Sequence, residues 1–173
     1  MNDIEKLENT LRAGGVCRWH TTPEIPPQNV AAHSWGVAVI CMYLGEGDFC
    51  GGNAAANALI HDIAEFFTGD IPAPFRAQIE NTEAFKAVEA EFSDRLFMYR
   101  PEVPPITQLA DKLEALRWTH EARAHEINAQ ITDCIFDKAQ SFFIENKISS
   151  RLFNRVAELI FKWELPRESE ADQ

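Results

Sequence analysis

The stretch NALIHDIAEFFTGDIPAPF, residues 57–75, combines an apolar helical pattern with three ionisable side chains. His61, Asp62 and Glu65 fall within about one helical turn, among leucine, isoleucine and phenylalanine neighbours. Burying an ionisable group without a partner costs several kcal/mol, and a bound metal or a hydrogen-bonded site is the usual remedy. We therefore expect this helix to pack in the interior and to carry a functional site.

The ends of this helix are marked by residues that commonly begin and stop helices. Asn53 is a typical N-cap residue, and Gly69 is a typical C-terminal stop. Asp70 and two prolines follow directly. We expect one helix over residues 53–69 and a loop that holds Asp70 near its end.

Helical patterns also fill the rest of the chain, and strand-like alternation is nearly absent. CRWHTTPEIPPQN at residues 17–29 contains three prolines and predicts an ordered surface loop. The other expected helices cover residues 3–13, 29–45, 82–99, 128–146 and 149–163, and one more carries the stripe Ile106, Leu109, Leu113 and Leu116. The helix at 29–45 is central and largely apolar. In the helix at 82–99, the residues expected to face the core are Phe85, Val88, Phe92 and Leu96. The pattern predicts an all-α, single-domain bundle of six or seven helices.

Length and composition agree with one domain. The chain has 173 residues, of which 46% are hydrophobic and 25% charged, enough to bury a full core. We expect the domain to cover residues 1–165 and the polar segment 166–173 to form a loose tail. No apolar run reaches the roughly 18 residues of a membrane span, and the amphipathic start does not resemble an export signal.

The charge and the cysteines narrow the class of partner. A net charge of −11 disfavours a nucleic-acid polymer, because phosphate backbones recruit clustered lysine and arginine. A small anionic ligand would need a local group of cations. The four cysteines, Cys17, Cys41, Cys50 and Cys134, form no C-x-x-C pair, so we expect reduced thiols and a cytoplasmic protein.

Four side chains of the kinds that bind metals lie along this framework: His33, His61, Asp62 and Asp111. Two imidazoles and two carboxylates can hold a divalent ion such as Zn, Co, Mn or Fe, with Mg as a further option, and leave positions for water and substrate. Asp111 projects opposite the leucine stripe of its helix, where solvent is the default. Thr107 and Trp118 share its face, so the spacing leaves its surroundings open.

The order of these residues resembles a known family. His33, HD at 61–62 and Asp111, in a helical chain, are similar to the signature of the HD-domain metal-dependent phosphohydrolases. RW at 18–19, VAAHS at 30–34 and HDIAEFFTGDIPAP at 61–74 resemble the branch with the YfbR-type 5'-deoxynucleotidases and the compact phage dATP triphosphohydrolases. One departure is Ala32, where the motif commonly carries glutamate.

The resemblance implies a role for each matching position. His33, His61, Asp62 and Asp111 would bind the metal, Glu65 would handle a proton, and Asp70 would assist from the loop. The residues expected to bind substrate are Arg18 on a phosphate, Trp19 on the nucleoside, and the further cations His20, Arg76 and Lys112. The alternative is that Arg76 and Lys112 are ordinary solvated bases and that Trp19 anchors its loop to the core.

One other motif is rejected. HEARAH at residues 120–125 is similar to the zinc-protease pattern H-E-x-x-H, but its histidines are five residues apart. On one helix they would point about 140° apart, so they could not share an ion. We interpret His120 and His125 as surface or packing residues.

The function that the resemblance implies is hydrolysis of 2'-deoxynucleotides. Substrates such as dATP or another triphosphate are favoured because the short interval from Asp62 to Asp111 and the extra cations resemble the compact phage-type triphosphohydrolases. A 5'-deoxynucleotidase acting on monophosphates is the alternative. From other classes, a non-catalytic metal-binding or nucleotide-binding module and a plain helical scaffold remain open. Twelve phenylalanines and four tryptophans indicate a homo-oligomer, a dimer or higher, in a bacterial or phage-infected host cytosol.

Overall fold

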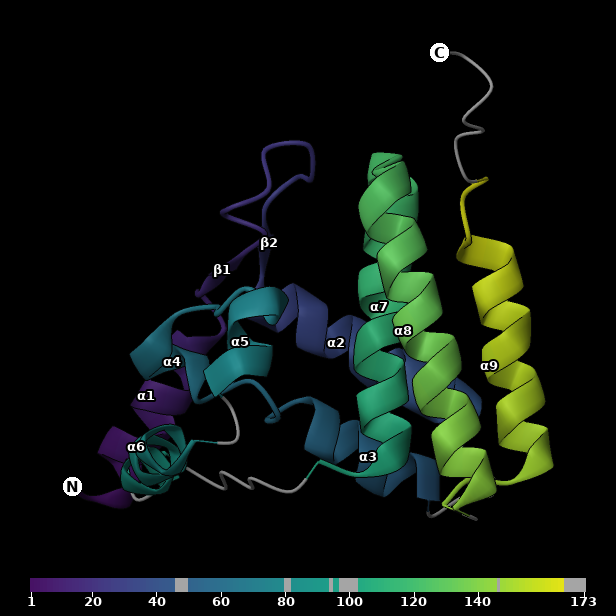
Figure 1. The fold of residues 1–173 in the computed structure, drawn as a ribbon. Coiled ribbons are helices and arrows are strands. Elements are labelled where there is room, and N and C mark those ends of the chain that lie inside the picture. Colours follow the sequence, from purple (N-terminus) through teal and green to yellow (C-terminus); the bar gives the residue numbers. More distant parts are fainter. Residues whose placement is uncertain (46–49, 80–81, 94, 97–102, 146, 167–173) are drawn as a thin grey trace.

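The computed structural model describes residues 1–45, 50–79, 82–93, 95–96, 103–145 and 147–166. Its helices (Figure 1) are α1 (Asp3–Ala13), α2 (Val30–Leu44), α3 (Cys50–Ala58), α4 (Glu65–Thr68), α5 (Ala73–Ile79), α6 (Glu83–Ser93), α7 (Pro105–Ala122), α8 (His125–Ile144) and α9 (Ser150–Trp163). The all-α class is confirmed. The described residues hold nine helices rather than six or seven, because residues 53–69 are divided and α5 was not expected.

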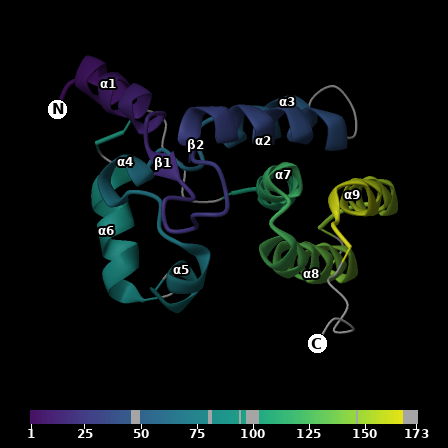
Figure 2. The ribbon, with the colours of Figure 1, turned by 90° about the horizontal axis from the view of Figure 1, so that it is seen from above.

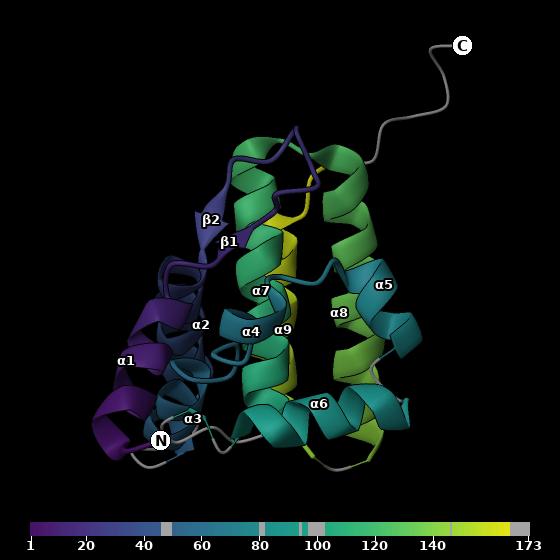
Figure 3. The same cartoon turned by 90° about the vertical axis from the view of Figure 1, so that its left-hand side faces the viewer.

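The core lies between two sets of helices. The helices α7, α8 and α9 run alongside one another, and α2 and α3 pack against α7 (Figure 2). The predicted stripe of α7 is at the centre, since Leu109, Leu113 and Leu116 are fully buried. Seen from its left-hand side in Figure 3, the molecule presents α4, α5 and α6 in front of this bundle.

A second, smaller apolar cluster brings together α1, the turn before α4, α4 itself and the residues after α6. It contains Ala13 at the end of α1, Ile63, and Leu96 beyond α6. Phe67 stacks on Phe92 of α6 with ring centroids 4.3 Å apart. Val88 was predicted to face the core, but it is exposed and belongs to neither apolar cluster. Residues 97–99, where that helix was expected to continue, lie outside the described residues.

The central helix α2 has one buried and one exposed side. Asn29 caps it by accepting a hydrogen bond from the Ala32 N–H at 2.8 Å. Val37 and Cys41 are buried against α3 and α7, whereas Trp35 and Met42 are exposed. The expectation of a helix buried nearly all round is therefore corrected, since no described element covers its outer side.

The expected helix over residues 53–69 is interrupted. Helix α3 begins at Cys50, so Asn53 lies inside it and does not cap it, and residues 59–64 form a turn before α4. Backbone hydrogen bonds across this turn span three residues, as from Ile63 N–H to the Ile60 carbonyl. His61 Nδ1 lies 2.6 Å from the Ala58 carbonyl oxygen and engages the end of α3. This side-chain bond competes with helix continuation, which local periodicity could not reveal.

The proline-containing loop is fastened by a short two-stranded sheet. Strand β1 (Cys17–Arg18) pairs antiparallel with β2 (Gln28–Asn29), with Arg18 opposite Gln28. At the tip of the loop, Trp118 Nε1 donates to the Pro26 carbonyl at 3.0 Å. The loop is ordered as expected, and its two strands set Arg18 and Gln28 beside α2.

The end of α7 separates the two histidines of the rejected motif. Arg123 adopts the left-handed conformation with φ of 57°, and a new helix starts at His125. His120 and His125 therefore lie on different helices, and both line a surface cavity of about 360 Å³ with Arg123. Their predicted role as surface or packing residues fits this position.

The described residues contain no helix long and apolar enough to cross a membrane. Cys17, Cys41 and Cys134 are free thiols. Of the predicted polar tail at 166–173, the residues after Pro166 lie outside the described part of the chain.

Candidate metal centre

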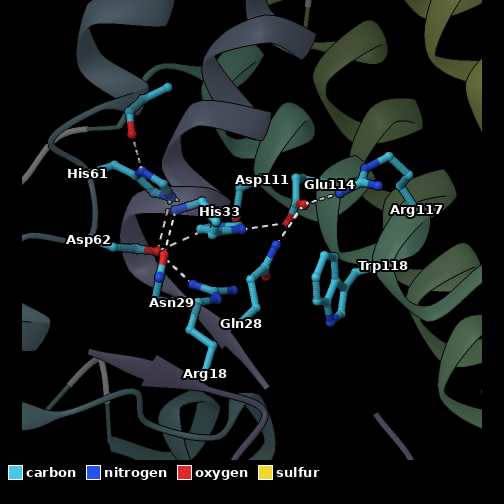
Figure 4. Close-up of polar contacts among 12 residues, drawn as sticks. Arg18, Gln28, Asn29, His33, His61, Asp62, Asp111, Glu114, Arg117 and Trp118 are labelled. Carbon is cyan, nitrogen blue, oxygen red and sulfur yellow. Dashed lines mark hydrogen bonds and ion pairs between the residues drawn. The ribbon is translucent and has the colours of Figure 1, made fainter. Parts of the chain in front are cut away.

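Four side chains that are distant in sequence meet at one point. His33 comes from α2, His61 and Asp62 from the turn between α3 and α4, and Asp111 from α7. One ligand atom from each lies within 4.8 Å of the others. Figure 4 shows these groups directed toward one another. The structure thus brings together the whole expected ligand set.

Both histidines present Nε2 to the centre of the cluster. His33 Nε2 lies 3.0 Å from Asp111 Oδ1, and His61 Nε2 lies 3.2 Å from Asp62 Oδ2. Both Nε2 atoms are buried, and neither has the alignment of a hydrogen bond with a described group. Their Nδ1 atoms face outward, to Glu114 for His33 and to the Ala58 carbonyl for His61.

The carboxylates complete the ring. Asp62 Oδ2 lies 3.4 Å from His33 Nε2, and Asp111 Oδ1 lies 3.8 Å from His61 Nε2. The side chain of Asp111 is 35% exposed, so the face of α7 opposite the leucines borders this cluster and is open to solvent there. The sequence left open whether Asp111 meets solvent or protein. Asp111 faces the histidines of α2 and the 59–64 turn, which lie beside α7 at this point.

The members of this cluster shift one another's pKa values. Burial lowers the pKa of His33, but interactions with Asp111 and Glu114 outweigh it and raise the pKa to about 9. Burial lowers the pKa of His61 as well, but Asp62 and Asp111 have the larger effect, so the pKa of His61 lies above its usual value. Burial raises the pKa of Asp111, but both histidines hold it well below its usual value. The site therefore favours positive charge at its centre.

The donor set fits a divalent ion. Two imidazole nitrogens without aligned partners and two carboxylate oxygens converge, which is the mixed nitrogen and oxygen set that zinc and first-row transition ions accept. A cation would replace the protons on His33 and His61 while keeping the attraction to Asp62 and Asp111. Each side chain thus has a physical reason to bind an ion.

A cation and an acid flank the cluster. Arg18 Nη1 donates to Asp62 Oδ2 at 2.7 Å and lies 4.0 Å from Glu65 Oε1. Glu65 is only 5% exposed. Burial and then the charge of Asp62 raise the pKa of Glu65 to about 8, against the opposing effect of Arg18. Glu65 is therefore mostly protonated at neutral pH and can donate a proton.

The loop after β1 contacts the loop after α4. Trp19 has φ of 63°, and its backbone N–H donates to Asp70 Oδ2 at 3.3 Å. His20 is exposed, with Nδ1 3.8 Å from the same oxygen. Asp70 thus joins the Arg18–His20 segment to the break after α4, on the Arg18 side of the cluster.

The two remaining predicted cations, Arg76 and Lys112, are not part of the cluster of four converging side chains. The guanidinium of Arg76, in α5, lies 6.0 Å from the ring of Phe85, and its charge lowers the pKa of Glu65. Lys112 follows Asp111 in α7 and projects about 100° away from it. Arg76 thus adds positive charge near Glu65, and Lys112 lies beside the cluster without belonging to it.

Two further residues of the site, Glu114 and Gln28, were not predicted from the sequence. Glu114 is fully buried, accepts from Gln28 Nε2 at 3.0 Å and contacts His33 (Figure 4). The sequence did contain a signal for Glu114, an ionisable residue between the buried leucines of α7, one turn after Asp111. The same kind of signal, an ionisable residue among apolar neighbours, identified His61. Gln28, in a proline-containing loop, had no such signal.

Comparison with known proteins agrees with this geometry. A dATP triphosphohydrolase of Salmonella phage PMBT28 is 35% identical over 136 residues, 70% of each chain. A dATP triphosphohydrolase of cyanophage S-2L is 32% identical over 121 residues, 65% of this chain and 69% of the relative. A 5'-deoxynucleotidase of Pasteurella multocida is 29% identical over 141 residues, 76% of this chain and 70% of the relative.

Among solved structures, the cyanophage S-2L HD phosphohydrolase bound to dA and one catalytic Zn²⁺ ion superposes with a TM-score of 0.66. The match covers 90% of this chain and 96% of that one at 22% identity, so it supports the fold. The family model described as HD domain matches residues 4–152, most of the chain. The helical fold, the converging histidines and aspartates, and this match together show that the chain belongs to the HD-domain family.

Proposed function

We propose that this chain is a divalent-metal-dependent phosphohydrolase that acts on 2'-deoxynucleotides, with dATP or another deoxynucleoside triphosphate as the favoured substrate. The observation that carries the proposal is the meeting of His33, His61, Asp62 and Asp111 within 4.8 Å, beside Arg18 and a buried acid. A metal ligand set alone would suit storage or structure. The neighbouring cation and protonated acid are what phosphate-ester hydrolysis requires.

The four converging side chains would hold the ion. When bound, it lowers the pKa of a water molecule and polarises a phosphoryl oxygen. The turn at residues 59–64 and helices α2 and α7 fix the ligands from three directions, so little reorganisation is needed. The side of the cluster next to Asp111 is open to solvent and leaves access for water and substrate.

Arg18 would bind a substrate phosphate. Its side chain is 13% exposed, and its guanidinium is paired with Asp62. A guanidinium matches two phosphate oxygens with parallel hydrogen bonds. In a chain with a net charge of −11, this cation and Arg76 supply local positive charge. That limited patch suits a nucleotide better than a nucleic-acid polymer.

Glu65 would supply the proton that the departing oxygen needs. Cleavage of a phosphorus–oxygen bond by water places a hydroxyl on phosphorus and needs a proton on the leaving oxygen. Protonated Glu65 next to Asp62 can donate it, and ionised Glu65 can recover a proton from solvent in the next step. Asp70 supports this arrangement by holding the Trp19 backbone and lies near His20, and Trp19 and His20 would contact the nucleoside.

The products of dATP would test the proposal. The triphosphate preference is supported by the two phage relatives, which are named dATP triphosphohydrolases. The protein is incubated with dATP and, separately, with dAMP. We expect faster turnover of dATP, which yields either triphosphate with deoxyadenosine, pyrophosphate or phosphate. Faster release of phosphate from dAMP would favour the 5'-deoxynucleotidase alternative, for which the Pasteurella multocida relative is the precedent. No turnover of either with any divalent metal would contradict the enzyme proposal.

We also propose that the protein acts as a homo-oligomer in the cytoplasm. The relevant surface, called here the outer apolar face, lies on α1 and α2 and consists of Ile4, Leu7, Leu11, Trp35, Val39 and Met42, all exposed. Both helices lie along one edge of the molecule in Figures 2 and 3. If each of these six side chains has a surface of about 170 Å², their exposed fractions add up to roughly 600 Å² of apolar area. This area is close to the apolar part of the surface that one partner buries in a protein–protein interface of standard size.

A second copy of the chain fits this face better than a membrane does. Helix α2 contains no aspartate, glutamate, lysine or arginine, so two copies can meet there without juxtaposing like charges of an acidic protein. Helices that lie on membranes are rich in lysine and arginine on their polar side. Helix α2 has neither residue, and α1 has only Lys6 and Arg12 among three acidic residues. A two-fold axis would bring the same apolar stripe of each copy together.

A further inference from the structure

The two histidines of the cluster are held by different kinds of group. His61 Nδ1 faces a neutral backbone carbonyl, whereas His33 Nδ1 lies 2.6 Å from the carboxylate oxygen Oε2 of Glu114. His33 and Glu114 are both fully buried. A carboxylate only accepts hydrogen bonds, so Glu114 requires the proton of His33 to be on Nδ1. The lone pair of neutral His33 is then on Nε2, directed at Asp62 and Asp111.

Glu114 is itself held in place from two sides. Its other oxygen, Oε1, accepts from Gln28 Nε2 at 3.0 Å and from Arg117 Nη2 at 2.9 Å. Arg117 is turned toward it by a second bond, to Glu121 at 2.5 Å. Because both neighbours occupy Oε1, Oε2 remains for His33. Gln28 comes from strand β2, so the short sheet contributes to this support.

Helix α2 leaves the space that Glu114 occupies. A Cβ atom on Gly36 would lie 2.8 Å from Glu114 Cγ and 3.2 Å from its Oε1. Real Cβ atoms do not approach so closely, so any larger residue at position 36 would displace Glu114. Gly36 lies one turn after His33 on α2, and glycine there lets α7 bring its carboxylate up to the imidazole.

We propose that Glu114 is a positioning residue that fixes the tautomer and the orientation of His33 for metal binding, with Gly36, Gln28 and Arg117 holding Glu114 in place. The proposal rests on the metal role proposed above for His33. A carboxylate behind a ligating histidine orients the ring and makes it a stronger donor, and its loss typically weakens metal binding 10–100-fold. Glu114 has this role for His33 alone, since His61 is oriented by a backbone carbonyl.

Metal affinity tests the proposal directly. The Zn²⁺ dissociation constant, measured by competition with a chromophoric chelator, should rise about 10–100-fold in Glu114→Ala. Glu114→Gln should also weaken binding, because Glu114 accepts through both oxygens and the amide has only one. Its NH2 group would face either His33 Nδ1 or the donors of Gln28 and Arg117. Gly36→Ala, which keeps every polar group, should also weaken binding by displacing Glu114.

Thr119→Ala is the matched control for a change that only destabilises α7. Thr119 is fully buried and bonds to Leu116 and Asn128, away from the cluster. This variant should unfold more easily yet bind Zn²⁺ as the wild type does. The visible spectrum of the Co²⁺-loaded protein should change in Glu114→Ala and not in Thr119→Ala, because it reports ligand geometry.

The outcomes separate the two proposals. If the wild type binds Zn²⁺ and both Glu114 variants and Gly36→Ala bind it equally well, the positioning role is wrong and the metal site stands. If the weakening is the same in Thr119→Ala, general stability explains it and the positioning role is again wrong. If the wild type binds no divalent metal, the proposed function fails first.

Discussion

Glu65 is the residue on which the proposed chemistry depends most. Replacing it with glutamine keeps its size but removes the proton that it can give. We predict that Glu65→Gln lowers kcat for dATP by about 100–10,000-fold while leaving bound metal unchanged. Product release followed by chromatography, with metal content on the same samples, measures both. Wild-type turnover in this variant would remove Glu65 from proton transfer.

The raised pKa of Glu65 also predicts how stability depends on pH. Its pKa rises from an ordinary 4.5 to about 8 in the folded chain, so the folded state binds an extra proton between these values. Glu65 therefore costs the wild type stability as pH rises from about 4.5 to about 8, and glutamine does not.

We predict that metal-free Glu65→Gln gains stability over the wild type as pH rises from 5 to 8, by on the order of 1 kcal/mol or more. Urea unfolding at several pH values, with chelator present, measures the difference. Asn154→Ala, an exposed substitution on α9 that changes no titrating group, is the control and should give a difference independent of pH. A constant difference for Glu65→Gln as well would mean that its pKa is not raised.

Individual site residues differed in how far the sequence could identify them. The group at His61, Asp62 and Glu65 was recognisable because ionisable side chains interrupt an apolar pattern. Asp111 could be assigned only by resemblance, since helical projection placed it opposite the buried face. Glu114 was not found, because its partner His33 is 81 residues away and only packing brings them together.

The break after α4 depends on one glycine. Gly69 has φ of 68° and ψ of 173°, a conformation that other residues rarely adopt. We predict that Gly69→Ala lowers the free energy of unfolding by about 1–3 kcal/mol through backbone strain, although the space around it is open. Because Asp70 follows directly, KM for dATP should also rise.

Gly15→Ala is the comparison for this substitution. Gly15 also follows a helix, but it has no positive φ, and its nearest contact is ordinary at 3.4 Å. Its stability should change by no more than about 0.5 kcal/mol in urea unfolding. Equal losses in the two variants would show that Gly69 holds no strained conformation.

The elements themselves were largely predictable. Amphipathic spacing located α1, α8 and α9 close to their observed bounds. The largely apolar run located α2, and the stripe from Ile106 to Leu116 located α7 without giving its bounds. The helix expected over residues 53–69 was wrong because its interruption comes from a side chain, His61, bonding to the Ala58 carbonyl. The strands β1 and β2 are two residues each, too short to produce an alternating pattern.

The association of whole molecules can be tested on the outer apolar face. Trp35 is 68% exposed at its centre, and a charge there would be buried against a like charge in a symmetric pair. We predict that the wild type has a mass of at least twice 19.6 kDa by light scattering and that Trp35→Glu is shifted to monomer. Phe161→Glu on α9, where Phe161 is 87% exposed, is the control and should leave the mass unchanged.

Monomeric wild type at all concentrations would contradict association. A Trp35→Glu mass equal to that of the wild type would place the contact elsewhere, and dissociation by Phe161→Glu alone would point to α9. Pelleting of the wild type with lipid vesicles would favour a membrane as the occupant of this face.

The arrangement of the whole chain was the least accessible from sequence. Composition and periodicity predicted one helical bundle, but which helix faces which depends on long-range packing. The outer side of α2 illustrates this, since an apolar helix looks the same in sequence whether a neighbouring helix or a second molecule covers it.

The central claim is that His33, His61, Asp62 and Asp111 bind one catalytic divalent ion. The most direct measurement is an anomalous difference map from crystals grown with Zn²⁺ or Mn²⁺, recorded at the absorption edge of the metal. We predict one strong peak per chain, within coordination distance of all four side chains. A map without a peak at this position, or with the ion bound elsewhere, would contradict the account.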